Sequence, residues 1–438
     1  EGVDVPCVRE EKTRRFLLTH GRLLFLVRGR PSCRKDAVVA ELEALYPASR
    51  AYMSAKPTKW DCATVKQLHD RCFSTVEGFM KTDSAVIINQ SPCVMVWETT
   101  SFIALACTYG YTVIIIDLPR ETSSDSQVLI TPDKAQEKPY VTYSVKRWEE
   151  LHPFAMGWSA RPKDAARLLR RFRQLRTVLL TRDQTLSPGD VFSSQVSPFC
   201  LARLCRFGRT PEDRDYCKSE KVRKAYGRSD TLRVFGYAIS QGFVFALLEL
   251  SDQQASLTRG DGGASGDIDP QSWKEVSCLV DLARFSPEED GNDREGRVGQ
   301  RVSLKDVDAS RVTFMPLGSV RGVRYSYSRA SGVPWALLSS RLRSWTTQSA
   351  EGAGCSKRVA GVDVYGSIGA ADDVLLLVDD KTVELDVVFT GCYHPHTTAL
   401  SNRIPAMPRV ARCSSPERCS WRQGRRGGRP EGTLSWRR

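Results

Sequence analysis

The chain has 438 residues, of which 41% are hydrophobic and 26% are charged, a composition typical of globular domains with substantial cores. No run reaches the roughly 18 apolar residues of a membrane span, and the 14 cysteines include no CxxC pair, so a transmembrane protein and a common zinc motif are both disfavoured. The net charge is +13, and residues 401–438, with ten arginines and two acids, contribute +8 of it. The rest of the chain is only mildly basic, which does not by itself indicate nucleic acid.

Apolar runs of strand length alternate with helical patterns in the first half of the chain. We expect strands at 23–29, 84–89 and 112–117, and helices at 36–46 and 97–107. Continuous apolar strands joined by helices are typical of a parallel sheet that is covered on both faces. The sequence therefore predicts an α/β domain over residues 21–185, preceded by an N-terminal segment, residues 1–20.

A long amphipathic helix is predicted at 161–182. Its apolar face contains Ala165, Leu168, Leu169, Phe172, Leu175 and Leu179. Its other face contains Arg167, Arg170, Arg171, Arg173 and Arg176. We interpret the arginines as the solvated side of a helix that packs by its apolar stripe, in preference to a surface that binds RNA or lipid. The turn-forming residues 186–190 then mark a domain boundary.

The second half of the chain is richer in strand patterns. They lie at 231–239, 243–250, 311–318, 374–380 and 383–391. We expect a second, α+β domain over residues 190–398, with polar loops at 252–272 and 286–300. The arginine-rich tail, residues 399–438, is expected to be disordered; binding to RNA or acidic lipid through its charge and an artefact of the gene model are both open readings of it.

The run "RGRPSCRKD" after the first predicted strand has the spacing of a phosphate-binding loop. Such a loop needs two glycines around the phosphates, a lysine and then a hydroxyl that holds magnesium. Gly29 and Lys35 stand at the first glycine and the lysine, but Arg34 replaces the second glycine and Asp36 the hydroxyl. The sequence therefore predicts a degenerate phosphate loop at Gly29 and Lys35, and an ATP- or GTP-binding switch remains a weaker alternative.

Several segments, in order, resemble the 2′,3′-cyclic nucleotide 3′-phosphodiesterases of myelin and their regeneration-induced fish relatives. The resemblance spans most of residues 9–396. It includes "LLFLVRGRP" (23–31), "YGYTVIIIDLP" (109–119), "HPFAMGW" (152–158), "CRFGRTPEDRDYCKSEKVRKAYGRSDTLRV" (205–234) and "VVFTGCYHPH" (387–396). It implies a polynucleotide-kinase-like P-loop domain followed by a two-histidine phosphoesterase domain, a hydrolase that opens cyclic phosphates to 2′-phosphates.

The resemblance also identifies the catalytic positions, where two His-x-Thr motifs face each other on opposed strands. The first motif falls on Phe199 and Leu201 and the second on Thr313 and Met315. No imidazole remains to move a proton, and Leu201 and Met315 offer no hydroxyl to a phosphate. The chain has only five histidines, and the single His-x-Thr, at His396, stands alone. We therefore expect an impaired enzyme, a pseudoenzyme.

The kinase-like half departs from the family in the same direction. The family's acidic pair after the second strand falls on Asn89 and Gln90, and a further acid falls on Lys56. Magnesium prefers oxygen ligands from carboxylates, so the sequence predicts no metal site and no cofactor. No cysteine-led prenylation box is present at the end of the chain, "LSWRR".

Two functional hypotheses follow from the resemblance. The first is a cytoplasmic binding protein, with association at the membrane periphery left open, whose partners would be RNA or a 2′,3′-cyclic nucleotide, cytoskeletal proteins, or an acidic membrane surface contacted by the arginine-rich tail. The alternative is an active cyclic nucleotide phosphodiesterase that uses non-standard residues.

Overall fold

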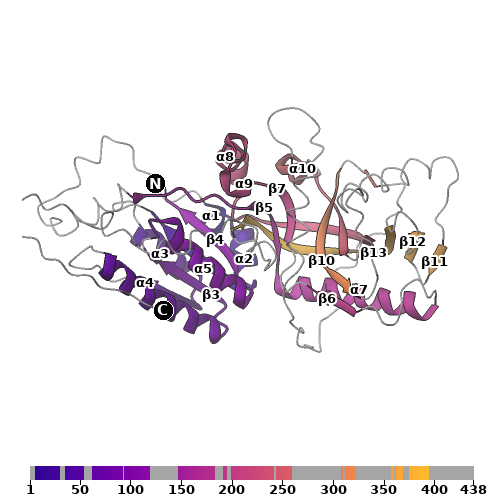
Figure 1. Cartoon of the computed structure of the whole chain (residues 1–438), viewed down its shortest axis with the longest axis horizontal. Coiled ribbons are helices and arrows are strands. Elements are labelled where there is room, and N and C mark those ends of the chain that lie inside the picture. Colours follow the sequence, from indigo (N-terminus) through magenta and orange to yellow (C-terminus); the bar gives the residue numbers. More distant parts are fainter. Residues whose placement is uncertain are drawn as a thin grey trace, which may run out of the picture.

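The computed structural model describes thirteen segments of the chain, which hold two β-sheets and the helices around them (Figure 1). The described residues are 5–29, 35–53, 62–91, 93–118, 147–182, 191–194, 199–240, 243–258, 307–308, 311–321, 357–359, 362–367 and 374–393. The predicted loop 286–300 and tail 399–438 lie outside them, as do His394 and His396. No helix in these segments is long and apolar enough to cross a membrane.

The first sheet is parallel and has four strands in the order β2-β3-β1-β4. The strands are β1 (Leu23–Arg28), β2 (Ser49–Met53), β3 (Val86–Gln90) and β4 (Thr112–Asp117). The helices of this half are α3 (Lys35–Leu45), α4 (Cys62–Lys81) and α5 (Val96–Tyr109). Separate apolar clusters fill its two faces, one around Phe25 and Ile114 and the other around Leu24 and Phe102. The predicted strands β1, β3 and β4 are confirmed.

The second sheet is antiparallel and has nine strands, seven of them in the order β11-β12-β13-β8-β9-β10-β6, with β5 paired to β13 and β7. Its strands are β5 (Ala155–Ala160), β6 (Val191–Ser194), β7 (Phe199–Leu204), β8 (Ser229–Ser240), β9 (Phe243–Glu249), β10 (Val312–Arg321), β11 (Lys357–Val359), β12 (Val362–Ser367) and β13 (Val374–Cys392). The fold class is therefore mixed α/β, one parallel and one antiparallel sheet.

Two predictions for the second half are wrong in detail. The expected strands at 374–380 and 383–391 form the single strand β13, whose pairing with β8 shifts register between Val378 and Val383. The start of the expected loop 252–272 is a helix, α10 (Asp252–Thr258), because Gln254, Ala255 and Leu257 are buried against the sheet.

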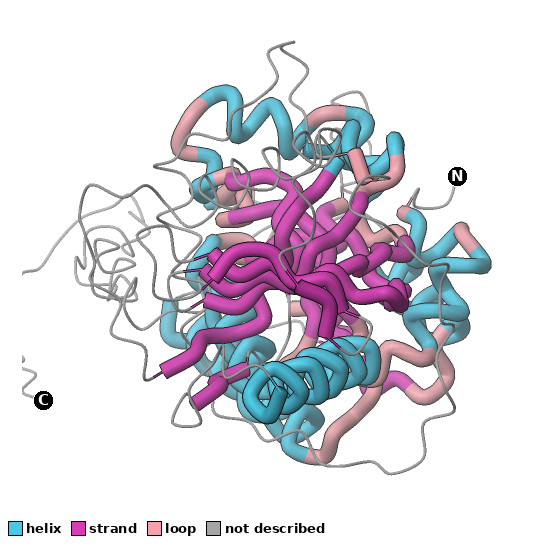
Figure 2. Tube along the Cα trace, turned by 90° about the vertical axis from the view of Figure 1, so that its right-hand side faces the viewer, coloured by secondary structure: helices cyan, strands magenta, loops and turns pink. Residues whose placement is uncertain are grey.

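Residues 186–190, where the sequence predicts a domain boundary, lie outside the described residues, but the strand and helix before them can be assigned to a sheet. Strand β5 pairs with β13 in the antiparallel sheet, with Ser159 opposite Val388. Helix α7 (Pro162–Arg182) packs its Leu168 and Phe172 into the core of the same sheet. Figure 2 shows this helix in front of the strands. Residues 155–182 thus lie with the second sheet and not with the first, where the sequence analysis placed them.

The arginines of α7 do not form one solvated face. Arg171 donates from Nε and Nη2 to the carboxylate of the buried Asp379, both at 2.7 Å. Arg167 contacts the carbonyl oxygen of Glu384 and lies 3.0 Å from Asp164. Arg170 and Arg173 are exposed. The interpretation as solvated side chains fits these two residues and is wrong for Arg167 and Arg171, because sequence spacing does not reveal their partners on β13, the carbonyl of Glu384 and the carboxylate of Asp379.

The two sheets meet along the outer edge of β4. The Ile115 amide donates to the hydroxyl of Tyr226 at 2.9 Å, and the Thr390 hydroxyl donates to the carbonyl of Val113 at 2.7 Å. An unpaired strand edge buried without partners would cost free energy at each polar group. Side-chain hydroxyls from the second half of the chain thus form hydrogen bonds with backbone groups on the edge strand β4 of the first sheet.

The N-terminal segment strengthens the same junction. It forms α1 (Pro6–Arg9) and α2 (Glu11–Leu18), whose Phe16 and Leu17 share an apolar cluster with strands of the first sheet and with Val388 of β13. The hydroxyls of Thr13 and Ser229 lie 3.2 Å apart.

Removal of the Tyr226 hydroxyl tests this junction. In Tyr226→Phe the buried amide of Ile115 loses its acceptor, so the free energy of unfolding should fall by about 1–3 kcal/mol in chemical denaturation. The matched control is Tyr109→Phe, whose hydroxyl donates to the partly exposed Glu77 at 3.2 Å. That variant should stay within about 0.5 kcal/mol of the wild type. Equal losses in both variants would contradict the role given to Tyr226.

Candidate functional site

The first pair of expected catalytic positions lies on β7 and faces an apolar cluster. Leu201 is 3% exposed and Phe199 packs beside it. Strands alternate their side chains between faces, so Cys200 and Ala202 point to the opposite face, toward the core under α7. The cluster around Leu201 is formed by Phe235, Phe245, Leu247, Phe314, Tyr365 and Leu376, among others. A phosphate bound on this face would contact apolar side chains, which offer its oxygens no hydrogen-bond donor.

The second pair of expected positions lies on β10, but on the other face. Met315 is fully buried in the core under α7, and Thr313, two residues before it on the strand, lies on the same face. The side chain that shares the cluster of Leu201 is Phe314. The structure thus does not bring Thr313 and Met315 together with Phe199 and Leu201.

None of the histidines in the described segments lies on a strand of the second sheet. His20 follows α2 and is buried, and His69 lies on α4, where its Nε2 is 3.1 Å from the Ser101 hydroxyl. His152 precedes β5 and pairs with the exposed Glu150 at 3.3 Å. No imidazole from these segments replaces the two that the family uses.

Gly29 and Lys35, the described ends of the run that the sequence predicts to be a degenerate phosphate loop, lie at the carboxyl end of the parallel sheet, where ligands of α/β folds bind. Gly29 is buried at the end of β1, and Lys35 is the first residue of α3. The Asp36 carboxylate accepts a hydrogen bond from the side-chain amide of Gln90 at the end of β3. The chain thus brings together the two positions that would manage magnesium, but their side chains bind each other. No group of three metal-ligating side chains exists within the described segments.

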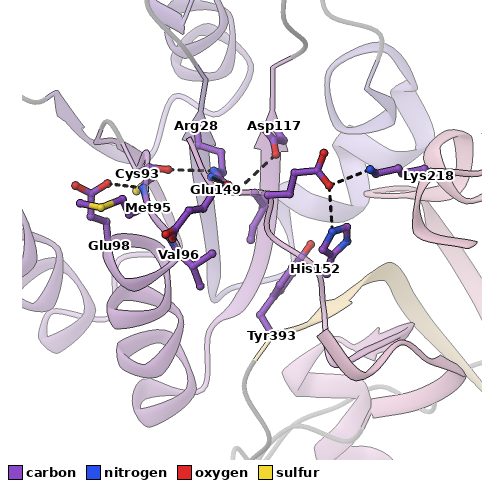
Figure 3. A network of polar contacts seen from close by, with 12 residues as sticks. Arg28, Cys93, Met95, Val96, Glu98, Asp117, Glu149, His152, Lys218 and Tyr393 are labelled. Atoms are coloured by element: carbon purple, nitrogen blue, oxygen red, sulfur yellow. Dashed lines mark hydrogen bonds and ion pairs between the residues drawn. The ribbon is translucent and has the colours of Figure 1, made fainter. Parts of the chain in front are cut away.

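A buried arginine that the sequence analysis missed occupies the same end of the sheet (Figure 3). Arg28 is fully buried and donates from Nε to the carbonyl of Cys93 at 3.1 Å and from Nη2 to that of Glu149 at 2.8 Å. Its Nη1 is 3.6 Å from Asp117, and its guanidinium lies over the ring of Trp148. A charged residue that ends an apolar strand run was the available signal. Nothing in the sequence pattern indicates Glu149.

Residues 148–149, far from Arg28 in the sequence, contact both Arg28 and the start of α5. The Glu149 carboxylate accepts from the Val96 amide at 2.7 Å, at the start of α5. Glu98 accepts from the Met95 amide at 3.0 Å, and burial raises the pKa of its carboxyl. The Arg28 guanidinium is surrounded by carbonyl oxygens, a carboxylate and an aromatic ring. Arg28 therefore holds residues 93 and 148–149 against the end of β1 and is not exposed to solvent.

Comparisons with known proteins do not assign this chain to a family. No protein-family model matches the sequence, and no curated protein matches it. A solved structure described as the crystal structure of a fungal RNA kinase is similar at 8% identity with a TM-score of 0.23, over 85% of this chain and 99% of that one. A TM-score of this size shows neither a shared family nor a shared activity, so the case for function rests on the residues.

The buried His20 predicts a pH-dependent stability. Burial, together with the charge of Arg161, lowers the pKa of His20 from 6.5 to about 4. Between pH 6.5 and pH 4 the His20 imidazole is protonated in the unfolded chain but neutral in the folded chain. The free energy of unfolding is therefore highest above pH 6.5 and falls as the pH drops toward 4. The loss should reach about 3 kcal/mol. Urea denaturation of the wild type and His20→Leu from pH 7 to pH 4 measures it, and the variant should lack this part of the slope. Identical slopes would contradict the assignment.

Proposed function

We propose that this chain is a catalytically silent relative of the 2′,3′-cyclic nucleotide 3′-phosphodiesterases and that it acts by binding partners. One observation supports this proposal above the others. Phe199, Leu201 and Phe314, on the two strands that would carry the His-x-Thr motifs, pack in one apolar cluster.

The reaction of that family has requirements that these side chains do not meet. One group must activate a water, a second must protonate the leaving 3′ oxygen, and hydroxyls must hold the phosphate oxygens. Each proton-transfer group contributes roughly 10²–10⁴-fold in rate. Burying a phosphate dianion against Leu201 and Phe314 would also cost several kcal/mol in desolvation without any compensating donor, on the order of the penalty for unpaired buried charges.

The kinase-like half supports the same conclusion independently. The side chains of Asp36 and Gln90 are hydrogen-bonded to each other, and residues 148–149 cover Arg28 at the carboxyl end of the sheet. A kinase needs an open crevice, a lysine and magnesium ligands at this position. We propose that this half is a structural support.

The partners remain those named from the sequence: RNA or a 2′,3′-cyclic nucleotide, cytoskeletal proteins, and an acidic membrane surface, for a cytoplasmic protein whose association with the membrane periphery is left open.

A hydrolysis assay on the purified full chain tests the silent state. With 2′,3′-cyclic AMP and 2′,3′-cyclic NADP as substrates, we expect no 2′-phosphate product above a no-enzyme control, because both proton-transfer groups are missing. The variants Phe199→Ala and Phe314→Ala separate real turnover from a contaminant. Turnover that survives repeated purification and is lost in either folded variant would overturn the proposal in favour of an active phosphodiesterase with non-standard residues.

A further inference from the structure

The N-terminal helices α1 and α2 depend on the surface against which they pack. They have four and eight residues, whereas isolated helices shorter than roughly 12–15 residues are marginal in water. The Tyr46 hydroxyl donates to the Cys7 carbonyl at 2.8 Å, and the Ser229 amide donates to the Thr13 hydroxyl at 3.1 Å. If these contacts with the two sheets are released, neither helix is stable.

A glycine hinge follows α2 and leads into β1. Gly21 has a φ of +94°, a conformation that residues with a side chain rarely adopt. A Cβ placed on it would have no heavy atom within 4 Å among the described residues beyond its neighbours in the chain. Hinge residues are those that can absorb a large change of φ and ψ, and Gly21 has the freedom and the space to do so.

His20, the residue before this hinge, is buried as an uncharged ring. It is 1% exposed and stands edge-on to Phe16, with ring centroids 5.6 Å apart. Neither of its ring nitrogens has a hydrogen-bond partner within the described segments. A protonated imidazole at this place would be a buried charge without a partner, which costs far more free energy than the neutral ring.

A neighbouring arginine makes protonation of His20 still less favourable. The Arg161 guanidinium lies 5.9 Å from the centre of the Phe16 ring, and its Nη1 donates to the Thr19 hydroxyl at 3.3 Å. Burial first, and then the charge of Arg161, lowers the pKa of His20 to about 4, and the backbone of Arg22 opposes them by a smaller amount. The acids of this region are bound to other cations: Asp164 and Asp386 to Arg161, at 2.9 and 3.3 Å, and Asp83 to Arg22, at 3.0 Å.

We propose that protonation of His20 releases residues 5–20 from the junction between the two sheets, with the chain rotating at Gly21. In the released state the imidazole reaches solvent, takes up a proton from it and moves away from Arg161. In the docked state the ring stays neutral. Since the proton binds the released state preferentially, acid shifts the equilibrium toward release. The N-terminal segment is then a pH-sensitive switch at the junction.

The size of this effect follows from the pKa of His20 in the two states. It is about 4 in the docked state, and in the released state it returns to the ordinary value of 6.5. The equilibrium constant for release therefore rises roughly 20-fold between pH 7 and pH 5. This inference is independent of the proposed loss of phosphodiesterase activity, because none of its residues lies among the positions discussed for that reaction.

Hydrogen exchange of the full-length protein, read by mass spectrometry at pH 7 and pH 5, tests the proposal. Amides of α1 and α2 exchange when the released helices unravel. After correction for the intrinsic exchange rate at each pH, residues 5–20 should exchange faster than β1 and β4 at both pH values. Their corrected rate should rise roughly 20-fold at pH 5.

Three variants complete the experiment. His20→Leu and His20→Phe both replace the titrating ring by an apolar side chain, so whichever of them folds should lose the rise at pH 5. The matched control is His69→Leu, which removes another partly buried histidine from the first half and should keep the rise.

Two results would overturn the proposal. One is a corrected rate for residues 5–20 that equals that of β1 and β4 at both pH values, because the segment would then open only when the whole chain unfolds. The other is a rate that does not change between pH 7 and pH 5, or that rises equally in a folded variant without His20.

Discussion

The outer edge of β4 is the constraint on which the rest of the structure depends. A four-stranded parallel sheet has two edges, and the β4 edge is buried by the second half of the chain. The hydroxyls of Tyr226 and Thr390 bond to two backbone groups on this edge, the amide of Ile115 and the carbonyl of Val113. Because these hydroxyls come from the region before β8 and from β13, residues of the second half supply hydrogen-bond partners to the first sheet.

Residues 155–182 show why sequence patterns alone do not assign a strand or a helix to a sheet. Residues 155–160 are a short apolar run followed by an amphipathic helix, which continues the strand-helix rhythm of the first half. Local periodicity cannot say which sheet a strand joins; β5 joins the second because its register with β13 buries Trp158 against Phe389. The strands β1, β3 and β4 were predictable because fully buried strands are continuous in apolar residues. Helix α10 was not, since its burial depends on tertiary contacts.

The candidate site could be predicted in part. The residue substitutions at Phe199 and Leu201 follow from the resemblance, and the structure places both in an apolar cluster. The face of β10 on which each side chain lies could not be predicted from the sequence, because alternation along a strand does not say which of its two faces meets which cluster. The structure places Phe314 in the cluster of Leu201, and Met315 on the opposite face. The same limit applies to Arg28, whose partners Cys93 and Glu149 lie far from it in the chain.

The central claim is that the face of β7 and β10 that contains Leu201 and Phe314 is core and not a phosphate-binding groove. Calorimetric titration of the purified protein with adenosine 2′-monophosphate, the product that such a groove would hold, tests it most directly. The account predicts no saturable heat. Saturable binding in the wild type that is lost in a folded Phe314→Ala variant would contradict it.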